Sequence, residues 1–398
     1  MSEPPFQTRI SRRHVLIGGT LGLAAMLSGI SSCDTPGTIT VNFLYSTEKS
    51  EWLEPAIQAF NNSNRQYNGK VIQVISTNSG SLDFAEKIVK NQLQPRPDAW
   101  CPASELELNR LDHLWQKANG LPVISSSTDL APRSLVRSPF VFAVWKDRAA
   151  ALLNAYTCVD WDTIHTALSL QDGWSNRALK HPEWGTQIHL GQTRPDLSNS
   201  GLLSTTLMAC AYFGSLNLSL TQAQVKDPTL WKYLAVFENA VNHFGESSGT
   251  YFSEAVIGEG PAAHTITLTY ESLVLLQDHV PEPLEMFYPK VNVISTHPFA
   301  ILNGPWLTSE RQQAAKMLRD FLRSDEQQRE AIKHGFRPWD STKPLADKND
   351  PKNPFNKFSQ LSPAHALDTP IEPVITTPSG DVVDALITQW QNHYPWPS

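Results

Sequence analysis

Apolar runs alternate with polar loops and amphipathic stretches through the first third of the chain. Each apolar run has the length of a buried strand, and each is followed by a polar turn and then by apolar side chains at helical spacing. Strands are predicted at 39–45, 71–75 and 97–101, and helices at 50–61, 82–93 and from Ser104 onward. Three successive units of strand, loop and helix predict a mostly parallel α/β sheet, in which ligands bind at the carboxyl ends of the strands.

The middle of the chain contains a second α/β block between two further apolar strands, which are predicted at 140–145 and 300–302. The block itself comprises predicted strands at 186–190 and 265–270 and predicted helices at 202–213 and 229–244. Since the block lies between the two apolar strands in sequence, we interpret these strands as hinge crossings into and out of a second lobe.

The last quarter of the chain is predicted to return to the first lobe. Residues 309–334 have the apolar spacing of a helix pair, and residues 380–393 that of a closing helix. Between them, residues 339–373 are rich in Pro, Asp and Lys, which favours an irregular segment on the surface. The predicted lobes are residues 38–140 with 295–398, and residues 141–294.

The first residues have the pattern of an export signal, predicted over 1–32. Arginines are concentrated between residues 9 and 13, and residues 15–30 form an apolar run that is too short and too rich in glycine for a confident permanent membrane span. Residues 11–16 (SRRHVL) resemble the twin-arginine motif of signals that export folded proteins, although the general export route stays open.

The export signal ends in residues 30–33 (ISSC), which resemble a lipobox. The resemblance implies lipidation of Cys33, a short linker at 33–37, and attachment of an exported protein to the outer face of the cytoplasmic membrane through lipid. The alternative is an ordinary cleaved signal followed by a chance cysteine.

Charge and cysteine content narrow the class of the mature protein. Loss of three arginines and one glutamate with the signal leaves 29 basic and 38 acidic residues, a formal charge of −9. No basic stretch is available to neutralise phosphates, so we expect no nucleic-acid partner. Beyond Cys33 the odd set Cys101, Cys158 and Cys210 permits at most one disulfide, and we favour three buried thiols over a disulfide pair.

Small hydroxyl and amide residues lie immediately before several predicted helices. Such turns present free backbone N–H groups and side-chain hydroxyls together, which suits anionic or oxygen-rich ligands. Simple N-capping accounts for any one of these turns, but it explains three such turns in two different predicted lobes less easily. The predicted ligand-binding residues at helix starts are Ser46, Thr47, Glu48, Ser79, Gly80, Ser81, Ser104, Ser198, Asn199 and Ser200.

Two other positions of the predicted second lobe are candidates for ligand contact. Tyr270 and Glu271 end a predicted strand, where a phenol and a carboxylate can close over a solute; the alternative is that Tyr270 is core and Glu271 caps a helix. Thr193 precedes the Ser200 turn and is a further candidate, while the adjacent Arg194 more plausibly bonds to a neighbouring loop.

Several of these segments resemble the periplasmic solute-binding proteins with a two-crossing hinge, among them molybdate-type binders. The resembling segments are residues 43–49, 96–100, 181–185, 191–202 and 335–338. The resemblance implies a two-lobed, type II periplasmic-binding-protein fold, capture of a small polar solute between the lobes, and an ABC-type permease as partner. Glu48 and Glu271 beside the expected pocket depart from a typical oxyanion binder. From the neutral donors at the helix starts, we rank an oxyanion or carboxylate first, a sugar second and a cation third.

Enzyme classes find little support in the sequence. Residues 245–249 (GESSG) match the G-x-S-x-G pattern of a nucleophile elbow, but the preceding residues are predicted to be helical, whereas that elbow follows a strand. The sequence has no H-E-x-x-H motif and no other metal-ligand spacing, so we expect no resident metal and no cofactor. The competing interpretation is a sensor or scaffold lipoprotein that has the same fold and no transport role.

Overall fold

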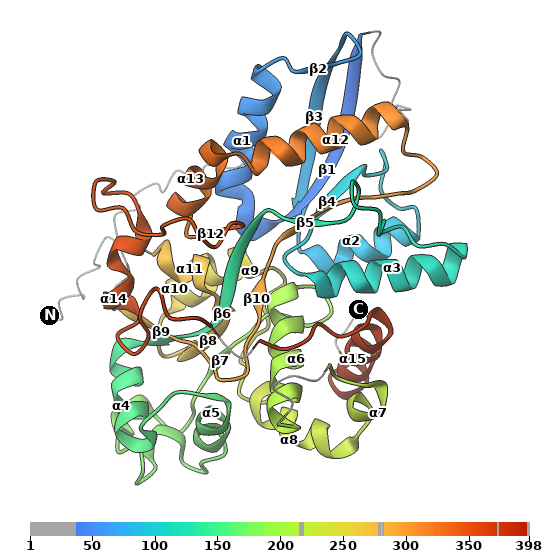
Figure 1. Ribbon diagram of the computed structural model, residues 1–398. Coiled ribbons are helices and arrows are strands. Elements are labelled where there is room, and N and C mark those ends of the chain that lie inside the picture. Colours follow the sequence, from blue (N-terminus) through green and yellow to red (C-terminus); the bar gives the residue numbers. More distant parts are fainter. Residues whose placement is uncertain (1–36, 215–218, 278–279, 281, 372–373, 396–398) are drawn as a thin grey trace, which may run out of the picture. The chain divides into compact units, whose positions relative to one another are not determined.

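The computed structural model describes residues 37–395 apart from 215–218, 278–279, 281 and 372–373 (Figure 1). The chain divides into two units, Met1–Cys33 and Asp34–Ser398, and the fold below is that of the second unit. The predicted export signal, the lipobox cysteine Cys33 and most of the linker lie outside the described residues. No helix in the described part of the chain is both long and apolar enough to cross a membrane.

The first sheet has the strand order β2-β3-β1-β4-β11-β5, and its centre is parallel. Strand β1 pairs in parallel with β3 on one side and with β4 on the other, as the alternation of strands and helices predicts. The strands span Thr38–Ser46 (β1), Gln66–Tyr67 (β2), Lys70–Ser79 (β3), Ala99–Cys101 (β4), Arg133–Ser134 (β5) and Pro298–Ile301 (β11).

Helices cover both faces of the first sheet (Figure 1). Alternate residues of β1 separate the two faces: Val41 and Phe43 pack with α1 and α12, whereas Leu44 packs with α2 and α3. The helices span Ser50–Asn62 (α1), Ser81–Val89 (α2), Glu105–Asn119 (α3), Ser309–Leu322 (α12) and Asp325–Lys333 (α13). A parallel sheet buried on both faces explains why residues 39–45 are apolar almost without interruption.

Two chain segments pass side by side between the first sheet and a second one. Strand β5 continues into β6 (Val136–Trp145), and β10 (Ile294–Ser295) continues into β11. Within the first sheet β11 pairs with β5 at Pro298 and Ser134, and within the second β10 pairs with β6 at Ile294 and Pro139. The two segments are therefore antiparallel neighbours where they cross.

The second sheet is mixed and is centred on β6, in the order β10-β6-β8-β7, with β9 and β12 also paired to β6. Strand β8 runs antiparallel to β6, and β7 runs parallel to β8. The strands span Leu190–Gly191 (β7), Ile266–Tyr270 (β8), Leu284–Phe287 (β9) and Arg337–Pro338 (β12). The α/β fold with mixed sheets flanked by helices confirms the predicted fold class. A mostly parallel sheet is predicted for each lobe, however, and the second sheet is mainly antiparallel, because β8, β9, β10 and β12 all run antiparallel to β6.

Helices and short helical turns surround the second sheet. The longer ones span Lys146–Tyr156 (α4), Trp161–Leu168 (α5), Asn199–Tyr212 (α6), Pro228–Glu238 (α8) and Gly380–His393 (α15). The shorter ones span Thr47–Lys49 (η1, beside the first sheet), Gly173–Ser175 (η2), Pro182–Trp184 (η3), Gln222–Val225 (α7), Ser248–Thr250 (α9), Tyr251–Val256 (η4), Ile257–Glu259 (α10), Glu271–Leu275 (α11), Pro354–Lys357 (η5) and Phe358–Leu361 (α14). Helix α15 has the predicted bounds.

Two predicted elements of the second block are wrong in extent. The strand predicted at 186–190 is reduced to β7, because Thr186 and Gln187 are exposed and belong to a loop. The helix predicted at 229–244 ends at Glu238, since Asn239 caps it and Val241 then bridges to Leu190 beside the sheet. The apolar residues that prolong the helical pattern thus belong to an extended segment.

From Arg337 onward the chain packs largely around the second sheet, although α15 also contacts α3 beside the first sheet. Strand β12 pairs with β6, and Phe358, Val383 and Trp390 join the core cluster of β6 and β8. The same cluster includes Leu82 beside the first sheet, so it extends across the junction between the two sheets and does not by itself define a boundary between two lobes. The lobe boundaries 38–140 with 295–398 and 141–294 stay a prediction.

Candidate functional site

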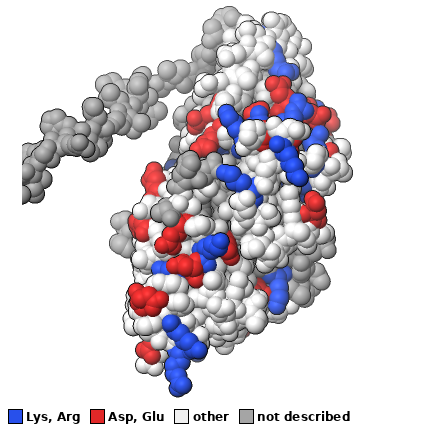
Figure 2. Space-filling model, turned by 90° about the vertical axis from the view of Figure 1, so that its left-hand side faces the viewer, with Lys and Arg blue, Asp and Glu red and all other residues white. Residues whose placement is uncertain are grey.

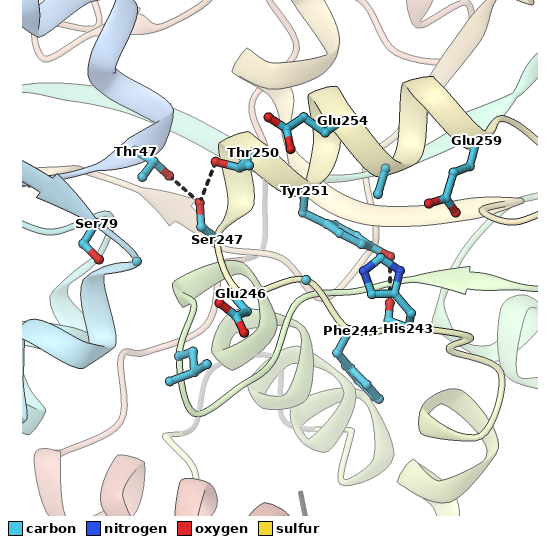
Figure 3. Close-up of a pocket in the computed structure, with 14 residues that line it drawn as sticks. Thr47, Ser79, His243, Phe244, Glu246, Ser247, Thr250, Tyr251, Glu254 and Glu259 are labelled. Atoms are coloured by element: carbon cyan, nitrogen blue, oxygen red, sulfur yellow. Dashed lines mark hydrogen bonds between the residues drawn. The ribbon is translucent and has the colours of Figure 1, made fainter. Parts of the chain in front are cut away.

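A cavity of about 780 Å³ lies where the carboxyl ends of β1 and β3 face a helical segment beside the second sheet (Figure 3). Thr47 follows β1, Ser79 ends β3, and Gly80 precedes α2. The opposite wall is the continuous segment α9, η4 and α10, which contributes Thr250, Tyr251, Glu254 and Glu259. Carboxyl ends of parallel strands are the usual ligand position in such sheets, and the volume is typical of a small-molecule site.

The two walls touch at the edge of the cavity. The Thr47 and Ser247 hydroxyls are 2.8 Å apart, and Ser247 donates to the Thr250 hydroxyl at 3.3 Å (Figure 3). Gly80 approaches the opposite backbone so closely that a Cβ atom would lie 2.9 Å from the Glu246 carbonyl oxygen. Glycine is therefore required at this position for the observed approach of the walls.

Behind the cavity lies a buried hydroxyl network, which we define as Thr193, Ser198, Ser200 and Ser248. The Ser200 hydroxyl lies 2.7 Å from that of Thr193 and accepts from Ser248 at 2.8 Å, and Ser248 lies 3.0 Å from Ser198. All four residues are buried. Each hydroxyl is satisfied by another protein group, so the predicted donors Thr193, Ser198 and Ser200 bond to side chains of this network.

A second buried chain of polar groups connects the two sheets. The Ser104 hydroxyl donates to Asn199 Oδ1 at 2.7 Å, and Asn199 Nδ2 donates to the Tyr270 hydroxyl at 2.8 Å. Burial raises the pKa of Tyr270 well above its ordinary value, so the phenol stays protonated. The predicted residues Ser104, Asn199 and Tyr270 are thus brought together across the junction.

Next to these groups is a charged cluster formed by Ser46, Glu48, Lys49 and His297. The Lys49 ammonium is buried, 2.7 Å from Glu48 Oε1 and 3.2 Å from His297 Nδ1, and it also donates to Ser46. Burial alone would raise the pKa of Glu48, but the Lys49 charge and the His297 hydrogen bond outweigh it and hold this pKa below its usual range. Burial and the Lys49 charge lower the pKa of His297 to about 4.

Glu271 takes part in a different ion pair, away from the cavity. Both of its carboxylate oxygens accept from the Arg337 guanidinium at 2.8 Å, and Oε2 also accepts from the Tyr288 hydroxyl at 2.5 Å. Burial would lower the pKa of Arg337, but the adjacent Glu271 carboxylate raises it above its ordinary value. This bidentate pair joins β12 to α11, and it does not bring Glu271 to the other predicted site residues.

The predicted site residues therefore separate into groups. Thr47, Ser79 and Gly80 line the cavity, while Ser46, Glu48, Ser104, Thr193, Ser198, Asn199, Ser200 and Tyr270 lie buried behind it. The Ser81 side chain and Cys33 lie outside what the structure describes. Arg194 bonds the neighbouring Asp196, as expected for a loop arginine. The described cysteines Cys101, Cys158 and Cys210 are free thiols; Cys101 and Cys210 are buried as predicted, whereas Cys158 is only half-buried.

The wall at 243–259 was not predicted from the sequence. Its G-x-S-x-G pattern serves close packing: Gly249 lies against the backbone of Glu48, and a Cβ at Gly245 would overlap the Tyr251 ring. The available signal was a run of small hydroxyl residues before a helix, the same signal that identified the other turns. The helix predicted at 229–244 runs past its true end at Glu238, and this error conceals the start of segment 243–259.

The cavity lining is acidic. It includes Glu246, Glu254 and Glu259, and none of the described residues that line it is Lys or Arg. On the molecular face in Figure 2, acidic and basic side chains are intermingled. Without a bound cation, these carboxylates disfavour an anionic solute in the outer part of the cavity.

Three potential metal ligands lie at one end of the same wall. One ligand atom from each of His243, Glu259 and His264 lies within 4.8 Å of the others. His243 and Glu259 are exposed and line the cavity, whereas His264 is buried. No metal site was predicted, because the spacing of these residues matches no metal-binding motif.

Comparisons with known proteins identify the fold and the family. The sulfate-binding protein SubI from Mycobacterium tuberculosis is 15% identical, with 87% of this chain and 95% of that chain covered and a TM-score of 0.52. The periplasmic binding protein AfuA from Actinobacillus pleuropneumoniae, solved with fructose-6-phosphate, is 17% identical, with 89% of this chain and 98% of that chain covered and a TM-score of 0.55. The ferric binding protein from Campylobacter jejuni is 12% identical, with 89% of this chain and 98% of that chain covered and a TM-score of 0.55. These identities show a shared fold alone.

The sequence itself gives the family. No curated protein matches the chain at a significant level. The model of the family described as bacterial extracellular solute-binding protein matches residues 41–337, which is well over half of the chain and includes both walls of the cavity. The protein therefore belongs to the bacterial extracellular solute-binding proteins, a family of binding proteins and not of enzymes.

Proposed function

We propose that the protein captures a small polar solute in the cavity between the two sheets and delivers it to an ABC-type permease. The observation that carries this proposal is the composition of the cavity walls: one wall follows the carboxyl ends of β1 and β3, and the other is the α9, η4 and α10 segment. A solute that contacts both walls stabilises their closure, because those contacts exist together only in the closed state.

The residues that line the cavity favour a solute class other than the oxyanion or carboxylate that the sequence ranks first. Hydroxyls of Thr47, Ser79 and Thr250 suit a polyhydroxylated solute, and the carboxylates of Glu246 and Glu254 accept from hydroxyls or attract a cation. The buried donors that suggested an oxyanion are bonded to one another. We therefore place a sugar-like or cationic solute ahead of an oxyanion or carboxylate.

Ligand-stripped full-length protein provides the test, by thermal unfolding against sugars, amines, divalent and ferric ions, sulfate, molybdate and carboxylates. A solute present at about 100 times its dissociation constant should stabilise the protein by roughly 2.7 kcal/mol. The double variant Ser247→Ala with Thr250→Ala, which removes wall hydroxyls, should weaken binding of that solute. Ser253→Ala is the matched control, because its exposed hydroxyl lies on the same helical segment and bonds only backbone carbonyls of that segment. A hit that is insensitive to the double variant would place the solute elsewhere.

One observation favours the alternative of a sensor or scaffold lipoprotein without a transport role. The deepest part of the junction, where the sequence predicted ligand contacts, is filled by side chains such as Lys49, Asn199 and Tyr270, each at most 2% exposed. A screen without any hit on stripped protein would support this second function.

We also propose that the protein is anchored through lipid on Cys33, in keeping with the lipobox-like residues 30–33. Cys33→Ala should abolish incorporation of labelled fatty acid, and labelling that persists in the variant would overturn the proposal. Export by the twin-arginine route predicts that Arg12→Lys with Arg13→Lys blocks export.

A further inference from the structure

We infer that His243, Glu259 and His264 form a binding site for a divalent transition-metal ion of the zinc class, at the cavity wall beside the second sheet. Two imidazoles and one carboxylate are the ligands that zinc takes in many open, three-ligand sites. The ligand atoms lie within 4.8 Å of one another. Because His243 and Glu259 are exposed, their side chains can turn to bring the atoms to metal-binding distance.

Local backbone geometry brings these residues together. Glu259 ends α10, and Gly260, with a φ of 76°, reverses the chain so that His264, in the loop just before β8, faces Glu259. His264 is held from behind, since its carbonyl oxygen accepts from the Trp145 indole at 2.7 Å. His243 lies on the neighbouring extended segment that follows the bridge between Val241 and Leu190.

The hydrogen bonds around Tyr251 indicate which nitrogen of His264 is free. The Tyr251 hydroxyl donates to the His243 carbonyl oxygen at 3.2 Å, and it lies 3.1 Å from His264 Nδ1 (Figure 3 shows the first contact). A phenol has one proton, so its oxygen accepts from Nδ1–H when that proton is directed at the carbonyl. His264 is then the tautomer whose Nε2 has a lone pair.

The lone pair of Nε2 faces a carboxylate. Nε2 of His264 lies 2.9 Å from Glu259 Oε2. Two acceptors at this distance repel unless a cation or a proton lies with them, and a metal ion satisfies both while the outer hydrogen bond to Tyr251 fixes the ring, as is usual for metal-binding histidines. All three ligands come from residues 243–264, so the site does not depend on closure of the cavity or on the identity of the solute.

Zinc titration of full-length protein without a histidine tag, after chelator treatment, tests the site by calorimetry. We expect one zinc ion per chain, and we expect His243→Ala and Glu259→Gln each to weaken binding at least tenfold. Both residues are exposed, so these variants should fold; far-ultraviolet circular dichroism checks that they do. Cobalt in place of zinc should give the visible absorption of a site with nitrogen and oxygen ligands.

His181 and Glu183 provide a matched control. They form another surface pair, with Nδ1 and Oε1 2.8 Å apart, and they are not members of the three-residue group. His181→Ala and Glu183→Gln should bind zinc as the parent protein does. Failure of the parent protein to bind zinc would mean that a proton alone bridges His264 and Glu259, and equal affinity in all variants would place the zinc elsewhere; either outcome overturns the inference.

Discussion

The cavity and the buried polar groups behind it lie between the same two sheets, yet their polar side chains are satisfied in opposite ways. The hydroxyl network of Thr193, Ser198, Ser200 and Ser248 is buried, and each hydroxyl has a protein partner. In the cavity, Glu246 and Glu254 are exposed to solvent. Groups that already have partners contribute to cohesion between the sheets, whereas groups facing open space are available to a solute. The difference separates structural from binding roles among residues of similar chemistry.

Loss of the buried Lys49 ammonium should give the largest decrease in the free energy of unfolding. Lys49→Met leaves Glu48 without its closest counter-charge at a buried position, and breaking such a pair typically costs about 3–5 kcal/mol. Urea denaturation at pH 7 measures the loss. The double variant Lys49→Met with Glu48→Gln should recover much of the stability, because no buried charge remains. If Lys49→Met lowers the free energy of unfolding no more than Glu254→Gln in the cavity does, burial of the charged group makes no difference to its contribution to stability.

Glu238 tests a deep carboxylate to which the described residues bring no neighbouring cation. Burial raises its pKa to about 7, against an ordinary value of 4.5, and its hydrogen bond comes from the neutral Gln192. A raised folded-state pKa gives stability that is present below about pH 4.5 and lost as the pH rises through about 7. Glu238→Gln should therefore stabilise the protein at pH 8 by about 3 kcal/mol and change little at pH 4.5. Denaturation midpoints at both pH values provide the measurement; an equal gain at both would show that ionisation is not the cause.

Two adjacent serines offer a sharper version of the comparison. Ser248 belongs to the hydroxyl network and bonds both Ser198 and Ser200, whereas Ser247 lies at the cavity edge and bonds Thr47 and Thr250. Ser248→Ala should cost about 1–3 kcal/mol, because buried hydroxyls lose a partner, and Ser247→Ala should cost less than about 1 kcal/mol, because water replaces it. Equal unfolding temperatures for the two variants would contradict the assignment of their roles.

Gly80→Ala should act on the approach of the two walls. The added Cβ would lie 2.9 Å from the Glu246 carbonyl oxygen and 3.1 Å from that of Leu197, which we expect to disfavour the closed arrangement by about 1–2 kcal/mol. Small-angle X-ray scattering should then give a larger radius of gyration than for the parent protein. Gly258→Ala is the control, since a Cβ there meets nothing within 4 Å. An unchanged radius in Gly80→Ala would show that backbone relaxation absorbs the contact.

Sequence patterns predicted the first sheet more fully than they predicted the candidate site. The strand at 39–45 is buried on both faces and the helix at 380–393 has a regular apolar stripe, so local patterns suffice for both. Both partners of Asn199, Ser104 and Tyr270, are distant in sequence, and no local pattern reveals whether such a donor meets a solute or another side chain. The wall at 243–259 contains a π-helical turn, Tyr251–Val256, that has no recognised sequence signature.

Helix α15 sets an expectation for the lifetime of the complex with solute. Gly380, the first residue of α15, packs so tightly on α3 that a Cβ would overlap the Asn109 carbonyl oxygen. Asp384 of α15 also forms an ion pair with Arg110 of α3. Asp381 accepts from Gln222 of α7, beside the second sheet. If the two sheets move apart when the walls separate, we expect α15 to release either its contacts with α3 or its contact with α7. We expect this release to slow the separation of the walls and therefore the dissociation of the solute. Gln222→Ala should then accelerate solute dissociation while the rate of association changes little.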